Sequence, residues 1–441
     1  MDGKGRNAQD GAPSLSRRDF VATSAASAAA AALFATGNYA YAQGSDRIRV
    51  GVIGSGGRGT GAAVNAMVCA PGVEVVALGD LFKDRVDGSF NRLRDLVKDA
   101  DMLRDYPDLA SRLKVTPERC FSGFDNYQKV IGAGVDMVLL ASPPGFRPIH
   151  YKAAVDAGKH VFMEKPVAVD GPGTRSVLAS SEVASQKRLG VVAGTQRRHQ
   201  NSYRETIKRL HDGAIGRIVG GQVFWNQGGL WRHNRRPGET DMEYQVRNWL
   251  YYTWLSGDHI VEQHMHNIDV ANWVLRAHPV RCLGMGGRQT RTGPEYGHVF
   301  DHFAVDFEYP NGVRILSMCR QQDGTDSNVS ERFAGTTGDT NAAGHIGGPN
   351  AWNFSGPNPD PYTQELTHLV ASIRAGNPLN EGRQVAESTL AAIMGRMSAY
   401  TGKVVSWEQA LNSQESLVPA TFEFGAMPTP PVAMPGKTPL T

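Results

Sequence analysis

The sequence predicts an α/β protein with two domains, the first built on a doubly wound parallel sheet and the second on a largely antiparallel sheet. The first observation is an alternation of short β-branched runs with helical stretches, which is typical of parallel βαβ units with right-handed crossovers. The second is a change after Asp170 to longer extended runs with alternating positions, as in a sheet with two unequal faces. The third is the length of 441 residues, which exceeds that of a typical single domain.

These runs place the domain boundary near residue 170. The first set of β-branched runs covers 47–53, 73–78, 135–141 and 160–163, and the second set covers 217–226, 302–309 and 312–319. We expect a first domain at 47–170, a second at 171–407 whose last helices can pack back on the first, and an extended Pro-rich tail at 408–441. The stretch 327–358 is rich in Gly, Asn, Ser and Thr, which predicts a long functional loop.

Composition excludes several classes of protein. Hydrophobic residues make up 41% of the chain before its 50 glycines are counted, so most of the chain is globular rather than disordered. The 46 basic and 43 acidic residues are interspersed and leave a net charge of +3, so we expect no nucleic-acid partner. The four cysteines are scattered singly, which disfavours a zinc ribbon or a disulfide framework and predicts free thiols.

The first 42 residues carry the pattern of a twin-arginine (Tat) export signal. Arg17 and Arg18 precede an Ala-rich apolar stretch at 21–35, and Ala40-Tyr41-Ala42 fits a small-x-small cleavage site. We expect the export machinery to carry the folded chain out of the cytoplasm, so that the mature protein is periplasmic or secreted. No Cys follows the cleavage site, so we expect no stable membrane anchor. A short N-terminal helix is the alternative.

A Gly-rich turn follows the first expected strand and precedes a helix. It reads Gly54-Ser55-Gly56-Gly57-Arg58-Gly59. In a G-x-G-x-x-G motif, Gly54 permits the tight turn, Gly56 lets the backbone approach a pyrophosphate and Gly59 lets the helix pack on the strand. Asp80 closes the second strand 21 residues after Gly59, where a carboxylate accepts ribose hydroxyls and repels a 2′-phosphate. We therefore expect a dinucleotide site, including Gly57 and Arg58, that prefers NAD to NADP; an incidental Gly-rich turn is the alternative.

A longer string gives a family resemblance. Residues 157–166 read A-G-K-H-V-F-M-E-K-P, and this string resembles the A-G-K-H-V-x-x-E-K-P element of the Gfo/Idh/MocA oxidoreductases. The resemblance runs from about residue 47 to about residue 407. It implies a Rossmann domain followed by a domain with an open-faced, largely antiparallel mixed sheet, and an NAD(P)-dependent oxidoreductase that acts on CH-OH groups. It also implies that Glu164 lies at the cofactor and that Lys165 reaches nicotinamide and substrate.

A second signature lies at 258–269. Family members usually show D-x-G-x-H-x-x-D, and this chain has Glu262, His264, His266 and Asp269 at those four positions. If the segment is one helix, Glu262, His266 and Asp269 share a face. We predict that His266 accepts the substrate hydroxyl proton, that Glu262 positions His266 or the substrate, and that Lys165 relays a proton.

A metal site on the same segment is the alternative for Glu262, His264 and His266, since imidazole and carboxylate suit zinc. On one helix, however, residues i and i+2 diverge by about 200°, so the two imidazoles cannot easily share an ion. We therefore predict no metal, and we expect His264 to pack against the neighbouring sheet.

The loop at 142–147 departs from the family pattern. It reads S-P-P-G-F-R where the family commonly has T-P-N-x-x-H. Because the loop follows a strand at its carboxyl end, we expect Ser142 and Pro143 to border the cofactor. Arg147 has two alternative roles: it contacts the cofactor or substrate, or it is exposed to solvent.

The stretch between positions 225 and 254 is dense in aromatic residues, among them Trp225, Trp231, Trp249, Tyr251, Tyr252 and Trp254. Aromatic faces suit the apolar faces of sugar rings. Core packing is the alternative for these residues. From this set we predict that Trp231 contacts the substrate, together with Arg198 and Asp269.

Taken with the resemblance, these features predict an exported enzyme that transfers hydride between a secondary alcohol of a sugar or cyclitol and a tightly bound NAD. One alternative is an NAD-requiring glycoside hydrolase that oxidises C3 transiently and then eliminates the aglycone. A lesser alternative is a non-catalytic sugar-binding protein. We expect a homo-oligomer that forms through the open-faced sheet.

Overall fold

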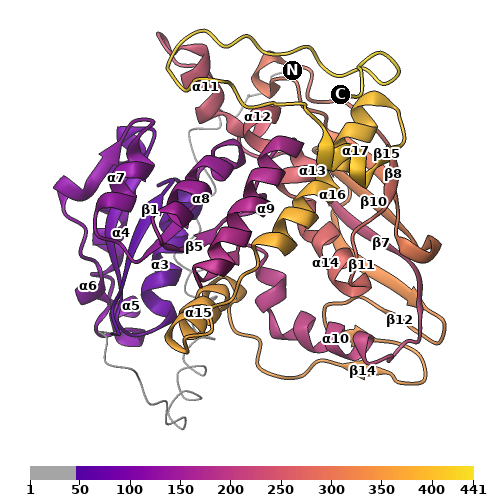
Figure 1. Ribbon diagram of the computed structural model, residues 1–441, viewed down its shortest axis with the longest axis horizontal. Helices are drawn as coiled ribbons and strands as arrows, with labels where there is room; N and C mark the ends of the chain where they lie inside the picture. The colour runs from indigo at the N-terminus through magenta and orange to yellow at the C-terminus, as the bar shows by residue number, and fades with distance from the viewer. Residues whose placement is uncertain (1–45) are drawn as a thin grey trace, which may run out of the picture.

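The structure is a computed structural model and describes residues 46–441. The expected export signal at 1–42 lies outside the described residues. The described chain is built on two sheets, and Figure 1 shows the first on the indigo and purple side and the second on the orange side.

A six-stranded sheet forms the first domain. Its order is β3-β2-β1-β4-β5-β6, and every neighbouring pair is parallel. The strands are β1 (Ile48–Ile53), β2 (Val73–Asp80), β3 (Cys120–Ser122), β4 (Met137–Leu140), β5 (His160–Met163) and β6 (Val191–Ala193). The order reverses between β1 and β4, so the crevice at the carboxyl ends of these strands is the expected ligand site of a doubly wound sheet.

Helices cover this sheet and leave its central strands fully buried, as in β4. They are α3 (Gly57–Cys69), α4 (Lys83–Leu96), α5 (Ala100–Asp105), α6 (Leu109–Arg112), α7 (Asn126–Gly132), α8 (Arg147–Asp156) and α9 (Gly171–Gln186), with short 3-10 turns η3 (Pro117–Arg119) and η4 (Pro144–Phe146). Two C-terminal helices return to this domain, because α15 (Pro361–Arg374) packs on α3 and α16 (Gly382–Thr401) packs on α9.

A nine-stranded mixed sheet forms the second domain. Its order is β14-β13-β12-β11-β7-β10-β9-β8-β15, and all neighbours are antiparallel except β7 and β10. The strands are β7 (Ile218–Gln227), β8 (Arg281–Gly287), β9 (His302–Glu308), β10 (Arg314–Gln321), β11 (Asn328–Gly335), β12 (Asp339–Thr340), β13 (His345–Ile346), β14 (Trp352–Asn353) and β15 (Val405–Ser406). Buried and exposed positions alternate along β8, β9 and β10, so the sheet has one covered and one open face, as predicted.

On the covered face of this sheet, α14 and α16 pack on the strands. The helices of the second domain are α10 (Asn201–His211), α11 (Asp241–Arg247), α12 (Thr253–Ser256), α13 (His259–Glu262), α14 (Met265–Leu275) and α17 (Trp407–Asn412), with 3-10 turns η5 (Gln196–His199), η6 (Trp249–Tyr251), η7 (Pro294–Tyr296) and η8 (Pro310–Gly312). None of the described helices is long and apolar enough to cross a bilayer.

The expectation of a loop at 327–358 is wrong. This segment holds β11, β12, β13 and β14, and β11 pairs with β7 along its whole length. Its inward positions include the charged Glu331 beside the apolar Phe333, so the usual apolar alternation is hidden. Backbone pairing with β7 therefore determines the strand, although its composition is that of a loop.

The tail beyond α17 has no helix or strand in the structure, and Figure 1 shows it in yellow running across the top of the molecule. All four cysteines lie in the described part of the chain and are free, as predicted.

Candidate dinucleotide and active site

The Gly-rich turn joins β1 to α3, and its glycines have different surroundings. Gly54 has a φ of 98°, in the left-handed region that favours glycine. A Cβ on Gly59 would overlap the carbonyl oxygen of Gly54, whereas a Cβ on Gly56 or Gly57 would have no atom within 4 Å. The turn therefore leaves open space beside the N-terminus of α3, whose first turn holds no acidic residue. Open space and helix N–H groups together fit a pyrophosphate.

Asp80 is fixed at the end of β2. Its carboxylate accepts the N–H of Ser55 at 2.7 Å and the N–H of Phe82 at 3.0 Å. Burial raises the pKa of Asp80, and the two N–H donors act in the opposite direction. The carboxylate thus ties the Gly-rich turn to β2 and keeps lone pairs for ribose hydroxyls. These residues fit a dinucleotide.

Arg58 is tied to the neighbouring segments. Its guanidinium donates to Glu164 and, at 3.0 Å, to Glu365 of α15, and it lies 4.9 Å from the ring centre of Tyr362. Glu164 follows β5, so the pair links the Gly-rich helix to the segment that holds Lys165. Arg58 and Glu164 therefore form an ion pair. Both were predicted to bind the cofactor.

Lys165 and Glu262 bring the two domains together. Lys165 follows β5 of the first domain, and Glu262 ends α13 of the second. The Lys165 ammonium lies 3.1 Å from Glu262 Oε1 and donates to the Glu262 carbonyl oxygen at 2.5 Å. Both side chains are largely buried, and the Lys165–Pro166 bond is cis. This pair places a cation and a carboxylate at the carboxyl end of a central strand.

The expectation of one continuous helix at 258–269 is wrong, because α13 ends at Glu262 and α14 begins at Met265. In an unbroken helix the Glu262 carbonyl would accept the N–H of His266. Here that carbonyl accepts the Lys165 ammonium, and the His266 N–H donates to Gln263 at 3.3 Å. The contact with Lys165 thus takes the place of a helical hydrogen bond.

His266 lies in the first turn of α14, and its ring stacks on Trp225 with centres 5.7 Å apart. Burial, followed by the charges of Lys165 and Arg197, holds the pKa of His266 well below its ordinary value. The imidazole is therefore neutral at pH 7. Among residues 46–441, no side chain forms a hydrogen bond to this ring, which leaves its nitrogens for a ligand.

His264 turns away from His266 and lies against the second sheet. Its Nε2 is 2.7 Å from the hydroxyl of Ser317 in β10, and burial lowers the pKa of His264 to about 3. Within the described residues, no three His, Cys, Asp or Glu side chains are grouped so that they could hold a metal ion.

Arg198 and Asp269 bind each other. The guanidinium donates to both carboxylate oxygens at 2.8 and 2.9 Å, and Ser388 donates to the same carboxylate at 2.7 Å. Contact between these residues and a substrate stays a prediction, since the geometry shows a buried bidentate pair. Trp231 lies in the loop after β7, where its ring meets Trp249 at 6.1 Å.

Trp225, and not Trp231, which the sequence predicts as a substrate contact, is the aromatic residue that stacks on His266. Its indole donates to Gln227 at 2.7 Å, and the Arg197 guanidinium lies 5.7 Å from its ring centre. The dense aromatic segment indicated both tryptophans, but only the fold separates them, because Trp225 lies within β7 and Trp231 in the loop beyond it.

The loop after β4 is organised by Arg147 and His150. Arg147 is buried and donates to the carbonyl oxygens of Glu164, at 2.7 Å, and Ser142. Arg147 is 2% exposed, so the alternative of a solvent-exposed arginine is wrong, and this burial lowers its pKa to about 10. His150 Nδ1 lies 3.2 Å from Ser142 Oγ. Ser142 and Pro143 lie in a loop that Arg147 ties to the end of β5, and their contact with the cofactor stays a prediction.

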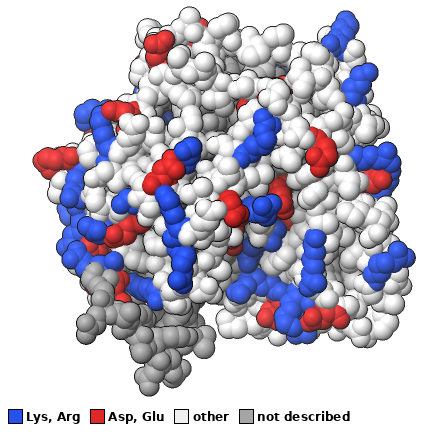
Figure 2. Space-filling model, viewed as in Figure 1, with Lys and Arg blue, Asp and Glu red and all other residues white. Residues whose placement is uncertain are grey.

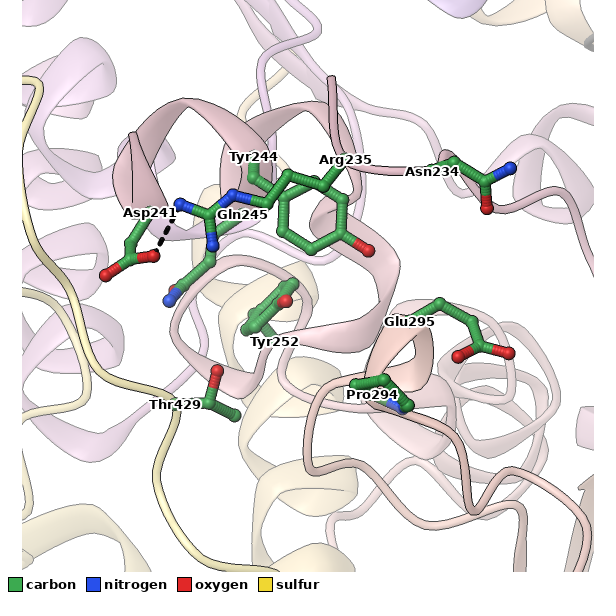
Figure 3. Close-up of a pocket in the computed structure, with 9 residues that line it drawn as sticks. All are labelled: Asn234, Arg235, Asp241, Tyr244, Gln245, Tyr252, Pro294, Glu295 and Thr429. Carbon is green, nitrogen blue, oxygen red and sulfur yellow. Dashed lines mark ion pairs between the residues drawn. The ribbon is translucent and has the colours of Figure 1, made fainter. Parts of the chain in front are cut away.

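A separate pocket of about 400 Å³ lies between α11, η7 and the tail. In Figure 3, Arg235 reaches Asp241 along one side of this pocket, at 2.7 Å, and Thr429 of the tail closes another side. None of the predicted site residues lines it. On the face shown in Figure 2, basic and acidic side chains are interspersed over the molecule.

Two family models match the chain. Residues 48–191 match the oxidoreductase family with an NAD-binding Rossmann fold, and residues 203–340 match the GFO/IDH/MocA C-terminal domain. The chain belongs to the Gfo/Idh/MocA oxidoreductase family. Its first domain is accordingly the NAD-binding Rossmann domain of this family, in agreement with the space beside Gly56.

The individual relatives and the solved structure that resemble this chain share at most 29% identity with it among those described next. The chain is 29% identical over 269 residues, 61% of its length, to inositol 2-dehydrogenase 3 of Saccharopolyspora erythraea, and spans 65% of that protein. It is 25% identical to a glycosyl hydrolase family 109 protein of Streptomyces coelicolor over 40% of this chain and 33% of that protein. The solved myo-inositol 2-dehydrogenase of Lactobacillus plantarum has the same fold, with a TM-score of 0.62 at 19% identity over 82% of this chain and 99% of that one.

Proposed function

We propose that this protein is an NAD-dependent oxidoreductase that transfers hydride between a secondary alcohol of a sugar or cyclitol and nicotinamide. The observation that carries the proposal is the Lys165–Glu262 pair beside a neutral His266, at the carboxyl edge of a sheet whose Gly-rich turn fits a dinucleotide. The inositol dehydrogenases among its relatives support this substrate class.

The chain's own groups have distinct roles in this reaction. The N-terminus of α3 and the carboxylate of Asp80 would hold the pyrophosphate and the ribose. NAD, when bound, supplies the hydride acceptor. His266 is neutral, so one of its nitrogens can accept the hydroxyl proton of the substrate.

Lys165 and Glu262 assist the proton transfer to His266. The carboxylate holds the ammonium at the end of β5, from where it can donate a hydrogen bond to the substrate oxygen. The positive charge also keeps the pKa of His266 low, so this imidazole releases the proton readily after the reaction.

Export, a retained cofactor and a homo-oligomer form part of the proposal. The twin-arginine pattern at 1–42 supports a periplasmic or secreted enzyme, and an enzyme outside the cytoplasm needs to keep its NAD bound. Exposed apolar side chains on the open face of the second sheet support association through that face.

One experiment tests the reaction. Denaturation of the purified protein should release NAD rather than NADP, and the native protein should reduce its bound cofactor when a suitable sugar or cyclitol is added, with an increase in absorbance at about 340 nm. A Lys165→Met variant should bind NAD but reduce it about 100-fold or more slowly. A protein that binds no nicotinamide nucleotide would contradict the proposal.

The second candidate is redox-neutral cleavage of a glycoside, which the glycosyl hydrolase relative favours. A hydrolase of this kind would release the aglycone from an aryl glycoside without an added electron acceptor, and with no net NADH. Stoichiometric sugar oxidation that depends on an acceptor would exclude it.

A further inference from the structure

The C-terminal tail is fixed at both ends of one short segment. Before this segment, the N–H of Leu417 donates to Asp170 at 2.8 Å. Near its far end, the N–H of Met242 donates to the carbonyl of Gly425 at 3.1 Å, and directly after it Gln245 donates to the carbonyl of Met427 at 2.6 Å. Residues 418–426 therefore form a strap between the first domain and α11, and Figure 1 shows this part of the tail passing near α11 and α12.

Between its anchors, the strap places two phenylalanines on three others. The ring of Phe424 lies 6.0 Å from that of Phe82 and 4.9 Å from that of Phe124. The ring of Phe422 lies 6.2 Å from Phe124 and 5.1 Å from Phe146. These five rings form one aromatic cluster, whose members come from the strap and from the first domain.

The three partners on the first domain all follow strand ends. Phe82 comes two residues after Asp80 and donates its N–H to that carboxylate at 3.0 Å. Phe124 follows β3 in the same way, and Phe146 ends the 3-10 turn after β4. Ligands of doubly wound sheets bind along this carboxyl edge, and the ribose carboxylate Asp80 marks the side that receives adenosine. The aromatic cluster therefore stands at the adenosine end of the dinucleotide site.

We propose that residues 418–426 close the adenosine end of the NAD site, with Phe82, Phe124 and Phe424 forming an aromatic wall for the adenine base. The proposal rests on NAD binding by the proposed function. An aromatic wall suits adenine, because every base has a π-face that stacks on aromatic side chains. Glu423 is the one charged residue at 418–426, so the wall is largely apolar.

The wall is held in place from its other side. Arg247 at the end of α11 lies 3.8 Å from the centre of the Phe82 ring and pairs with both carboxylate oxygens of Asp84 at 3.0 Å. Arg247 thus fixes the orientation of Phe82. A base stacked on a fixed aromatic wall under an anchored strap leaves only when the strap moves, and such a step mainly slows dissociation.

The test compares the rate at which bound NAD exchanges with excess isotope-labelled NAD, followed by mass spectrometry of the released cofactor. Phe424→Ala should speed the exchange about fivefold or more, since base stacking commonly contributes at least that factor. Phe424 is 44% exposed, so this variant should fold. Phe424→Tyr keeps the ring and should restore slow exchange.

Met434→Ala is the matched control, because Met434 is a similarly exposed residue of the same tail beyond the anchors. It should exchange NAD at the rate of the unmodified protein. Binding of AMP should weaken in Phe424→Ala, whereas binding of nicotinamide mononucleotide should not change.

If NAD exchanges from Phe424→Ala at the rate of the unmodified protein, residues 418–426 do not close the NAD site, and the proposed function is unaffected. Slower exchange would overturn it too, because it would mean that Phe424 occupies the place of adenine. Failure of the unmodified protein to hold any NAD would overturn both.

Discussion

Lys165 joins the two domains through its ammonium group, and its loss should therefore change more than one property. In Lys165→Met, Glu262 loses its partner and His266 loses the cation that lowers its pKa most. We expect turnover to fall about 100-fold or more, as for other positioned acid–base groups. The residual activity should show an acidic limb at higher pH, because the pKa of His266 rises.

The pH–rate profile of Lys165→Met measures both effects at once. Lys152→Met is the control, since Lys152 forms an exposed ion pair with Asp156 on α8. A Lys165→Met enzyme with full turnover would refute the assigned role.

Two glycines of the same turn should respond in opposite ways to one added methyl group. Gly56→Ala enters open space, so the protein should keep its melting temperature but lose NAD affinity about tenfold or more, because the methyl takes the space beside the pyrophosphate. Gly59→Ala overlaps the Gly54 carbonyl and should lower the free energy of unfolding by about 1–3 kcal/mol. Thermal unfolding and NAD titration of both variants separate binding from packing; equal loss of stability in the two would contradict this account.

The glycine roles could be predicted because a strand, a turn and a helix at fixed spacing determine them. The contact between Glu262 and Lys165 could not be predicted from the sequence. On one helix Glu262 and His266 would be neighbours, but the helix ends where a lysine 97 positions earlier takes the Glu262 carbonyl. Only the tertiary structure brings these atoms together, and the same holds for Trp225, whose approach to His266 depends on how β7 packs on α14.

Among the elements, β11 shows how a polar strand becomes part of the site. Its inward-facing Glu331 accepts from Arg197, from Tyr203 at 3.0 Å and from Asn267 at 2.6 Å. Apolar residues do not alternate regularly along the sequence of this strand, so its composition predicted a loop. In the fold, this buried carboxylate fixes the arginine that lies over the Trp225 ring.

Glu331→Ala should therefore destabilise the second domain strongly. The substitution leaves Arg197 buried without its carboxylate, and loss of one partner of a buried pair commonly costs about 3–5 kcal/mol. Asp156→Ala removes an exposed pair and should cost less than about 1 kcal/mol. Urea denaturation of both variants makes the comparison, and similar midpoints for the two would count against a structural role of Glu331.

At the scale of the whole molecule, buried histidines should make stability depend on pH. Burial lowers the pKa of His150 and His264 to about 3 and that of His298 to about 4, against about 6.5 in an unfolded chain. Above pH 6.5 both states are neutral at these residues, so they add nothing. As pH falls from 6.5 towards 4, the unfolded chain takes up protons that the folded one does not, and stability declines.

Each of these histidines can contribute up to about 1.4 kcal/mol per pH unit in this range. The free energy of unfolding, measured by denaturant titration at intervals between pH 7.5 and 5, should fall steadily below pH 6.5. A constant value across this range would show that these rings take up protons in the folded protein.

The open face of the second sheet carries the last prediction, because apolar residues form one continuous row across it. Across the strands, Met285 pairs with Ala304, and Ala304 with Met318, which pairs in turn with Phe224. Paired residues point to the same side of a sheet, so these four side chains form one apolar row. Met285 is 72% exposed, and an apolar side chain that stays in water does not stabilise a single chain.

A second copy of the chain can cover this row, and we expect a dimer in solution. Met285→Asp and Met318→Asp each place a charge in the row, so either variant should sediment as a monomer at concentrations where the unmodified protein is dimeric. Both should keep their thermal stability at low concentration, since the side chains are exposed in one chain. Ile149→Asp, on an exposed apolar position of α8 in the first domain, should leave the dimer unchanged. If all three variants sediment alike, the copies associate through another surface or not at all.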